Sequence, residues 1–522
     1  MRNIFFSLLA ICLFVACYDD ESTLPVIEYP SVVANKSGEP QFLVTSYGAE
    51  FTYEPRLCRM VGRDTVPLTT DEFKDYSYEW EITLLSDGND TTRQILSNER
   101  ILKTTIQSLP TTSSQFSYYN LTLHVTHIAS QVKKNLLWKV KVLGAYGTGL
   151  LVAETRDGKK SDLSIVMSRT YNNDIQDYES DVVHHNAYSR NNDNTQIDGV
   201  VSALTYVTDR KSYSDIMALV EGKSLVRIDP VSMKLMNRDM ECFYYAPKVF
   251  YPEVIFESWN RIVLINNGLV QYYEARYGNK FSVDMESRYN LAKAYVGKLG
   301  YVDAIFFDKN AEKFVQFSVR NKEVMDLGPV EAGKFDPNDM KGFECIYGGV
   351  GNDNTARWLM KKEGHYYVYE MDQVSYKGLN VYDLENCPDI GKSPCFAFSE
   401  SNPEFYYSVD NVLYVVPLSG DKPTRLTSYD KFGTNEKITH LLFHTGDGYT
   451  TWSEETDPAT GKTKPFWRSS ANNVMTVVTY DGKEGRVYTL PIQYGGSGGI
   501  APDKYVRCYD KFGEITGIGM RN

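Results

Sequence analysis

From Gly149 onward the sequence repeats one local pattern: an apolar run, a turn rich in Gly, Asn, Asp or Lys, and a second run with β-branched or aromatic residues. Apolar runs of this length separated by such turns predict β-hairpins. The turns are centred at residues 158, 222, 268, 309, 363, 410 and 482. Hairpins repeated radially bury their faces against their neighbours. The repeat therefore predicts a seven-bladed β-propeller over residues 149–522.

The C-terminal run, residues 515–520, alternates in character and has no hairpin of its own. The first hairpin begins at Leu150 and leaves little room for an inner strand before it. We therefore expect residues 515–520 to pair with the first hairpin. That pairing would close the propeller and leave only short, protected sheet edges.

Residues 41–148 show a different pattern, with short alternating runs at residues 76–82, 119–126 and 137–142. Several short strands at this spacing predict an Ig-like β-sandwich. Trp80 lies on the apolar face of its run, so we expect a core residue and not a ligand platform. The Tyr-x-Trp run ending at Trp80, followed by the Tyr-x-Leu-x-Leu-x-Val run from Tyr119, resembles a PKD domain.

The N-terminus has a basic Arg2, a mostly apolar run to Ala16, and then Cys17. This is the anatomy of a secretory signal, and the run is shorter than the roughly 20 apolar residues that span a bilayer. An ordinary signal peptide with an incidental cysteine is one alternative. The small residues before Cys17 resemble the lipobox of bacterial lipoproteins, which implies a signal peptide at 1–16 and lipidation of Cys17.

The segment after Cys17 carries three consecutive acidic residues, Asp19, Asp20 and Glu21. They resemble the signal that exports Bacteroidota lipoproteins to the outer face of the outer membrane. Residues 17–40 are then a lipidated, acidic tether leading to the sandwich. Acyl chains alone can hold a protein on a membrane, at about 0.8 kcal/mol for each buried methylene.

The composition fits an extracytoplasmic β protein, with 39 Tyr and 24 Phe against 6 Trp in 522 residues and a net charge of −12. The acidic balance and the lack of a basic cluster argue against nucleic acid as a partner. Six cysteines lie beyond Cys17, and none forms a Cys-x-x-Cys pair. Cys387 and Cys395 flank a loop that contains proline, and they are either a local disulfide or, like the other four, buried thiols.

The signal, the PKD-like region and a propeller entered through residues 149–165 together resemble the PKD-like family of Bacteroidota surface lipoproteins. Members are usually encoded beside SusC/SusD-type nutrient importers. The resemblance implies a non-catalytic accessory that captures or presents nutrient at the importer. It does not specify the nutrient, and a fold alone implies no activity.

Sequence motifs for catalysis are weak. Residues 495–499 match Gly-x-Ser-x-Gly but lack the strand-to-helix context of a nucleophile elbow, and a flexible loop is favoured. His184 and His185, near Asp181, point in opposite directions if the chain is extended, which disfavours a metal site. The Asn- and Asp-rich stretch 171–199 fails the EF-hand spacing. We therefore predict no catalytic residue, no metal and no cofactor.

Two long insertions, residues 171–199 and 445–473, interrupt the repeat and carry aromatic residues. Loops on a rigid scaffold often hold binding residues, and aromatic faces suit sugar rings or peptide side chains. The candidate ligand-binding residues are Tyr171, Tyr178, Tyr188, Tyr449, Trp452, Phe466 and Trp467. Equally, these aromatics could staple their loops to the propeller body. Closure of the propeller should bring the blades that carry the two insertions together.

The sequence thus predicts a two-domain, all-β, non-enzymatic lipoprotein on the cell surface. We expect it to serve a SusC/SusD-type importer by binding oligopeptide or oligosaccharide, or by docking on the importer. Two alternatives remain. A propeller hydrolase should show a buried cluster of acidic or nucleophilic side chains in the axial channel. The second alternative is a structural or adhesive surface protein. If the protein instead docks on the importer, it should show a broad apolar patch and no ligand pocket.

Overall fold

The computed structural model describes most of the chain after the N-terminal segment. The described residues are 31–39, 42–46, 50–61, 64–84, 93–105, 116–143, 146–172, 181–208, 214–258, 261–274, 278–282, 288–297, 302–444, 452–456, 463–467, 474–492, 499–500 and 506–521. Cys17, Asp19, Asp20 and Glu21 lie outside them. Within the described ranges, no helix is long and apolar enough to cross a membrane.

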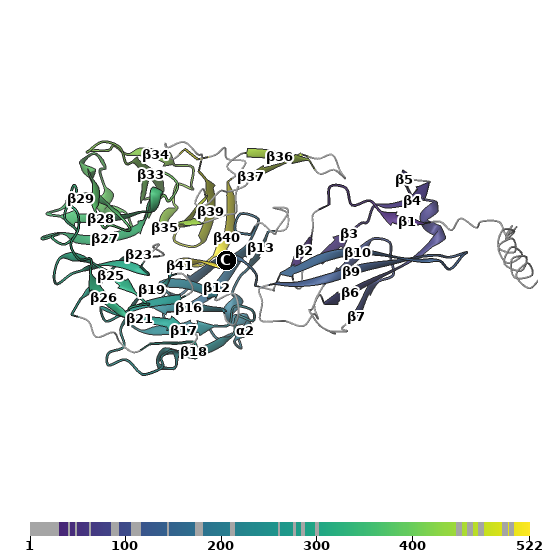
Figure 1. Ribbon diagram of the computed structural model, residues 1–522, viewed down its shortest axis with the longest axis horizontal. Coiled ribbons are helices and arrows are strands. Elements are labelled where there is room, and N and C mark those ends of the chain that lie inside the picture. Colours follow the sequence, from purple (N-terminus) through teal and green to yellow (C-terminus); the bar gives the residue numbers. More distant parts are fainter. Residues whose placement is uncertain are drawn as a thin grey trace, which may run out of the picture. The chain divides into compact units, whose positions relative to one another are not determined.

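The chain forms two compact units. The first takes its residues from 1–41, 50–105 and 119–139, and the second from 42–49, 106–118 and 140–522. Almost all regular structure in the described parts of both units is β-strand (Figure 1). The protein is therefore an all-β protein, as its sequence predicts.

The N-terminal strands form one large sheet and two small ones. In spatial order they are β1 (Val32–Ala34), β4 (Leu57–Val61) and β5 (Asp64–Pro67); β2 (Leu43–Ser46), β10 (Lys133–Leu143), β9 (Phe116–His127), β6 (Tyr76–Leu84) and β7 (Arg93–Ser97); and β3 (Glu50–Tyr53) with β8 (Leu102–Thr105). A 3-10 turn, η1 (Glu72–Asp75), precedes β6. The predicted strands at 76–82, 119–126 and 137–142 are confirmed as β6, β9 and β10.

Trp80 on β6 is a core residue, as predicted, with no exposed surface. Its ring centroid lies 5.6 Å from that of Trp138 and 6.0 Å from that of Tyr53. The Trp80 indole donates to the Glu99 carbonyl at 3.0 Å, and the Trp138 indole donates to the Glu39 carboxylate at 2.9 Å. Both buried N–H groups are thereby satisfied, which allows two large indoles to fill one core.

The second unit contains seven successive sheets among its described residues, the first with five strands and the other six with four. Sheet 1 is β41 (Glu514–Arg521), β11 (Gly149–Thr155), β12 (Lys160–Met167) and β13 (Val182–His184), with β14 (Ile197–Asp198) also on β12; sheet 2 is β15 (Ala203–Thr208), β16 (Ser214–Val220), β17 (Ser224–Ile228) and β18 (Leu235–Arg238); sheet 3 is β19 (Pro252–Ser258), β20 (Arg261–Asn266), β21 (Leu269–Glu274) and β22 (Lys280–Phe281); sheet 4 is β23 (Leu291–Gly297), β24 (Ala304–Asp308), β25 (Lys313–Ser318) and β26 (Glu323–Asp326).

The remaining sheets continue the same order. Sheet 5 is β27 (Glu344–Val350), β28 (Thr355–Lys362), β29 (His365–Asp372) and β30 (Gly378–Asp383); sheet 6 is β31 (Phe396–Phe398), β32 (Glu404–Val409), β33 (Val412–Pro417) and β34 (Leu426–Tyr429); sheet 7 is β35 (Lys437–His444), β38 (Val474–Tyr480), β39 (Gly485–Pro491) and β40 (Arg507–Phe512). The hairpin β36 (Trp452–Thr456) and β37 (Thr463–Trp467) is inserted between β35 and β38. The short helices are α2 (Ala187–Asn191), η3 (Asp239–Cys242), η5 (Asn352–Asn354), η6 (Leu384–Asn386) and η7 (Ile390–Lys392).

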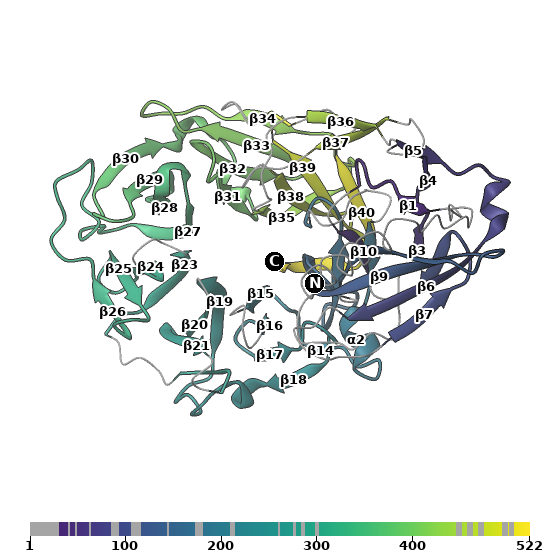
Figure 2. The same ribbon diagram turned by 45° about the vertical axis from the view of Figure 1, so that its right-hand side comes forward.

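The sheets pack in a closed circle (Figure 2). Seven hydrophobic clusters each combine residues of two consecutive sheets, and the last cluster joins sheet 7 to sheet 1. The first strand of each sheet, with β41 in that position for sheet 1, contacts the first strands of both neighbouring sheets. This arrangement is a β-propeller, in which apolar faces are buried between neighbouring sheets.

Both local expectations from the repeat are confirmed. All seven predicted hairpins are present, and the β20–β21 turn shows their logic: Asn267 and Gly268 have φ of 51° and 72°, as a tight two-residue hairpin requires. The C-terminal run pairs with the first hairpin, with Leu150 opposite Met520. Sheet 1 is therefore assembled from residues near both ends of the second unit.

The disulfide suggested for Cys387 and Cys395 is absent. Both thiols are free, as are Cys58, Cys242, Cys345 and Cys508. The Cys387 thiol approaches the Pro423 carbonyl, and the Cys395 thiol contacts the Ser408 hydroxyl at 3.3 Å. Burial raises the pKa of both thiols, to about 11 for Cys387 and about 12 for Cys395, so they are protonated at neutral pH.

Candidate functional site

The first insertion crosses sheet 1 from one neighbouring sheet to the other. At its start, the Tyr171 hydroxyl shares a 3.0 Å hydrogen bond with Thr476 of sheet 7. Asp181 accepts a 2.9 Å hydrogen bond from the Tyr509 hydroxyl, also of sheet 7. Beyond β13, helix α2 and β14 lie beside sheet 2. The expectation that the two blades carrying the insertions are neighbours is therefore confirmed, since sheets 7 and 1 share contacts.

A groove of about 270 Å³ opens between this insertion and the outer strands of sheet 2. Ile197, Val226, Leu235 and the buried side of Tyr188 give it an apolar floor, while Asn192, Asp193, Thr195, Gln196 and Arg238 bring amide, carboxylate, hydroxyl and guanidinium groups. Its lining is Tyr188, Asn192, Asp193, Thr195, Gln196, Ile197, Val226, Leu235 and Arg238. An apolar floor with a few polar groups above it is the usual composition of a small-ligand site.

Asn192 holds the groove together by joining α2 to sheet 2. Its amide nitrogen donates to the carbonyls of Tyr188 at 2.7 Å and Met233 at 2.8 Å, and its amide oxygen accepts from the Leu235 N–H at 2.8 Å. The bonds to Met233 and Leu235 reach from the end of α2 to the β17–β18 segment, while the bond to Tyr188 stays within the helix. The width of the groove is therefore set by a side chain whose own hydrogen bonds are satisfied.

The rim of the groove is charged. Asp193 is exposed with φ of 53°, followed by Asn194 with φ of 57°, so the chain turns sharply there. Arg238 is exposed on the opposite side, and its Nε lies 3.6 Å from the Asp239 carboxylate. Burial raises the pKa of the Tyr188 phenol, and the charge of Arg238 partly opposes that shift. Tyr188 is therefore a neutral hydrogen-bonding group at physiological pH.

The predicted aromatic platforms do not lie as expected. Tyr171 and Tyr188 are core residues, 6% and 4% exposed, so neither presents an open ring face, although Tyr188 lines the groove. Both pack beneath their insertion, which is the stapling alternative. Tyr178 and Tyr449 lie outside the described residues. Trp452 and Trp467 pair across the β36–β37 hairpin, with Phe466 beside them in β37, and only their backbones are described.

Sequence reasoning missed most of the groove. Asn192, Gln196 and Arg238 line it, although none was singled out in advance. The Asn-rich stretch 171–199 signalled the insertion but not its contact with β18. No sequence pattern predicts that the side chain of Asn192 contacts the backbone of Leu235.

A metal site is geometrically conceivable in the first unit. Ligand atoms of Glu79, Glu81 and His124 lie within 4.8 Å of one another. Glu81 is already paired with Arg93 at 2.7 Å and with His124 at 2.8 Å, while the other His124 nitrogen contacts Asn135 at 2.7 Å. A cation would have to displace Arg93. His184 and His185 instead pack on aromatic rings, those of Tyr146 and Phe512.

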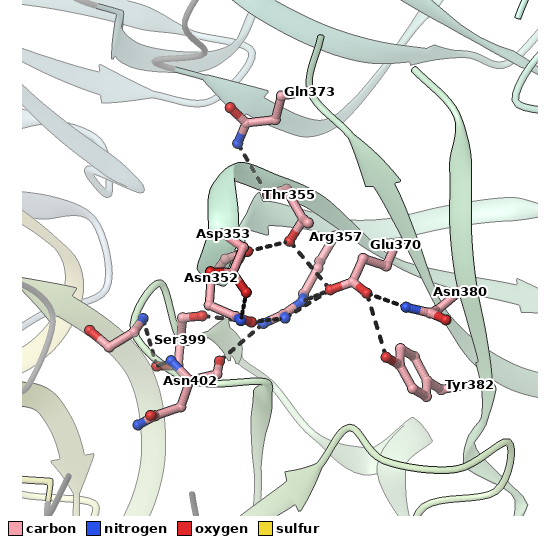
Figure 3. A network of polar contacts seen from close by, with 11 residues as sticks. Asn352, Asp353, Thr355, Arg357, Glu370, Gln373, Asn380, Tyr382, Ser399 and Asn402 are labelled. Atoms are coloured by element: carbon pink, nitrogen blue, oxygen red, sulfur yellow. Dashed lines mark hydrogen bonds and ion pairs between the residues drawn. The ribbon is translucent and has the colours of Figure 1, made fainter. Parts of the chain in front are cut away.

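A buried network of polar contacts surrounds Arg357 and Glu370 (Figure 3). Arg357 donates to Glu370 at 2.8 Å from both Nε and Nη2, and its Nη1 donates to the carbonyls of Ser399 and Asn402. Nη2 also donates to Asn352. Every donor of this guanidinium has a partner. The cluster therefore binds sheet 5 to the β31–β32 loop of sheet 6 through hydrogen bonds that use every guanidinium donor.

Comparisons with known proteins assign this chain to no family. No family model and no curated protein matches the chain. Among solved structures, apo AztD from Citrobacter koseri aligns at 8% identity and TM-score 0.37, covering 85% of this chain and 98% of that one. Dihydro-heme d1 dehydrogenase NirN aligns at 9% and 0.36, covering 84% and 74%, and the Dos1 propeller at 11% and 0.35, covering 77% and 91%. At these TM-scores the similarities support no functional argument.

Proposed function

We propose that this protein is a non-catalytic, lipid-anchored surface protein that binds an oligosaccharide or oligopeptide beside a SusC/SusD-type importer. Its fold, in this proposal, is a PKD-like sandwich followed by a propeller whose seven sheets are its blades. The observation that carries the binding function is the groove between α2 and β18, where an insertion of sheet 1 and the outer edge of sheet 2 place polar groups over an apolar floor.

The location rests on the N-terminal segment. Cys17 with small residues before it supplies the lipid anchor, and Asp19, Asp20 and Glu21 supply the export signal. Replacing all three acidic residues by Ala should abolish digestion by external protease in intact cells. Unchanged digestion would overturn surface display by this signal.

Binding is tested with the full mature chain in lipid nanodiscs. Calorimetric titration with two defined pools, a partial starch hydrolysate and a tryptic digest of casein, should give heat with at least one of them. The double variant Gln196→Ala with Arg238→Ala should lose this heat, because both side chains line the groove. Arg320→Ala is the matched control, an exposed arginine at the end of sheet 4. Equal binding by the double variant would overturn the groove as the site.

The importer is tested by copurification. The anchored protein should be recovered with a SusC/SusD-type complex from detergent-solubilised outer membrane. Recovery of this protein alone would overturn the accessory role.

A further inference from the structure

Beside the groove, one chain segment on β18, η3 and the loop before β19 carries several exposed apolar residues, which we call the strip. The strip consists of Leu235, Met236, Met240, Tyr244, Tyr245, Val249 and Tyr251, which are 39–62% exposed. Leu235 belongs to both the groove and the strip. Single exposed apolar residues are ordinary, but seven within seventeen positions of one chain segment are not.

The segment that carries the strip is held in place by buried neighbours in the sequence. Cys242 and Phe243 are 1% and 3% exposed, and the Phe243 ring lies 5.9 Å from Phe250 and 5.5 Å from Phe281. Asp239 accepts hydrogen bonds from the Ser224 hydroxyl at 2.6 Å and the Leu225 N–H at 3.2 Å. The segment is thus fixed on sheets 2 and 3 while its remaining apolar side chains face outward.

The backbone edge of β18 is partly occupied by side chains of this chain. Strand β18 is the outer strand of sheet 2, and such an edge can template an added strand. Here the N–H of Leu235 donates to the Asn192 side chain, and the N–H of Arg238 donates to the Glu241 side chain at 3.3 Å. Two of the four strand N–H groups are therefore already occupied by side chains, which favours recognition through the side chains of the ligand.

The dimensions favour a short ligand with one inserted group. The groove of about 270 Å³ lies just below the roughly 300–1,000 Å³ of drug-sized sites. It holds one side chain or one sugar ring, so most contact must come from the strip. At half of the 150–250 Å² of an aromatic side chain, the three tyrosines offer roughly 300 Å², and the four smaller aliphatic residues add at most about as much, for roughly 600 Å² in all. That is below the about 800 Å² per partner of a stable protein interface.

The chemistry of the strip discriminates between the two ligand classes. Tyrosine faces suit sugars and peptides equally, but Met236, Met240 and Val249 offer sugar hydroxyls no hydrogen-bond partner, and desolvating those hydroxyls is costly. Thioether side chains adapt to varied apolar partners, and Met and Tyr are enriched at peptide and protein contacts.

Resting on the proposed function, we propose that the ligand is an oligopeptide with apolar side chains, one of which enters the groove while the others lie along the strip. The polar rim of Asn192, Gln196 and Arg238 would then face the peptide backbone or a carboxylate. An oligosaccharide, a second copy of this chain and the importer itself are the competing occupants.

The test uses the full mature chain in nanodiscs and the same two pools. Peptides retained from the casein digest, identified by mass spectrometry, should be enriched in large apolar residues. The triple variant Met240→Ser, Tyr245→Ser and Val249→Ser should bind the best retained peptide at least about tenfold more weakly. The control Val374→Ser with Leu426→Ser removes exposed apolar residues of sheets 5 and 6 and should bind like the wild type.

The other outcomes separate the two proposals. Binding of the starch pool alone, lost on Gln196→Ala with Arg238→Ala, would overturn the peptide inference and leave the proposed function intact. Peptide binding that the triple variant leaves unchanged would also overturn the inference. A dimer or an importer complex that the triple variant abolishes, without peptide binding, would assign the strip to those occupants. Failure of both pools to bind would overturn both proposals.

Discussion

Two arginines are equally buried in the second unit, but they differ in how well their guanidinium groups are hydrogen-bonded. Arg357 on β28 is 1% exposed, and all its donors are paired. Arg521 on β41 has no exposed surface, and its Nε, Nη1 and Nη2 have no hydrogen-bond partner. Its guanidinium carbon lies 5.9 Å from the centroid of the Tyr206 ring. Burial lowers the pKa of Arg521 to about 10, so it is still charged at neutral pH.

The difference reflects how each sheet boundary is built. At the boundary of sheets 5 and 6, the network includes Asn352 and the carbonyls of Ser399 and Asn402, which come from loops that can adjust to the guanidinium. At the boundary of sheets 1 and 2, β41 approaches β15 closely because Gly517 and Gly519 have no side chains to keep the two strands apart. Regular strand packing there sets the position of Arg521, and no loop group reaches its nitrogens.

The largest effect should come from Arg357→Met. The substitution leaves the Glu370 carboxylate buried without its cation, and breaking one side of a buried pair costs about 3–5 kcal/mol. Chemical denaturation of the second unit should show this loss, whereas Arg320→Met, at an exposed arginine, should change the free energy of unfolding little. A loss as small as that of the control would mean that the network does not stabilise the boundary.

Gly519→Ala should be next and tests the tight approach of β41. A Cβ at this position would lie 2.7 Å from the Leu204 carbonyl oxygen, and overpacking of this kind costs about 1–3 kcal/mol. Gly297→Ala is the control, since its Cβ would meet the Phe256 ring at 3.3 Å, where a side chain can yield. Equal thermal stability of the two variants would contradict the close contact of β41 and β15.

Arg521→Met should have the opposite sign to the same change at Arg357. It removes a buried charge that the Tyr206 side chain and the charge of Asp229 compensate only in part, so we expect a gain of about 1–2 kcal/mol in the free energy of unfolding. Denaturation of both methionine variants under the same conditions gives the comparison directly. Destabilisation by Arg521→Met comparable to that of Arg357→Met would show that the two arginines are equally well paired.

The smallest effect concerns pH. Burial lowers the pKa values of His184 and His185, so both are neutral in the folded state, while in the unfolded chain they bind protons below about pH 6.5. Stability is therefore lost as pH falls from 7 toward 5. The charges around His185 are Glu154, Arg156, Arg190 and Asp510. His185→Gln should lose less stability than the wild type over this range, and an identical loss would contradict the contribution of His185.

The local sequence pattern was sufficient to predict the hairpins and β41, because their turn residues and apolar runs are consecutive in the sequence. It failed where direction mattered. The aromatic residues Tyr171 and Tyr188 stood out in a polar insertion, but which way a loop side chain points depends on contacts with sheets that are distant in sequence, such as that with Thr476. The groove could not be predicted for the same reason, because Asn192 and β18 come together only in the folded protein.

The pairing of Leu150 with Met520 also affects how the second unit assembles. Every other sheet can form from adjacent chain segments, but sheet 1 must wait until strands from both ends of the unit meet. Pairing at such sequence separation is slow because the loop entropy must be overcome first. Before closure, the free edge of β11 can accept β41 of another molecule in the same register, so strand exchange between two chains is the characteristic misassembly of this fold.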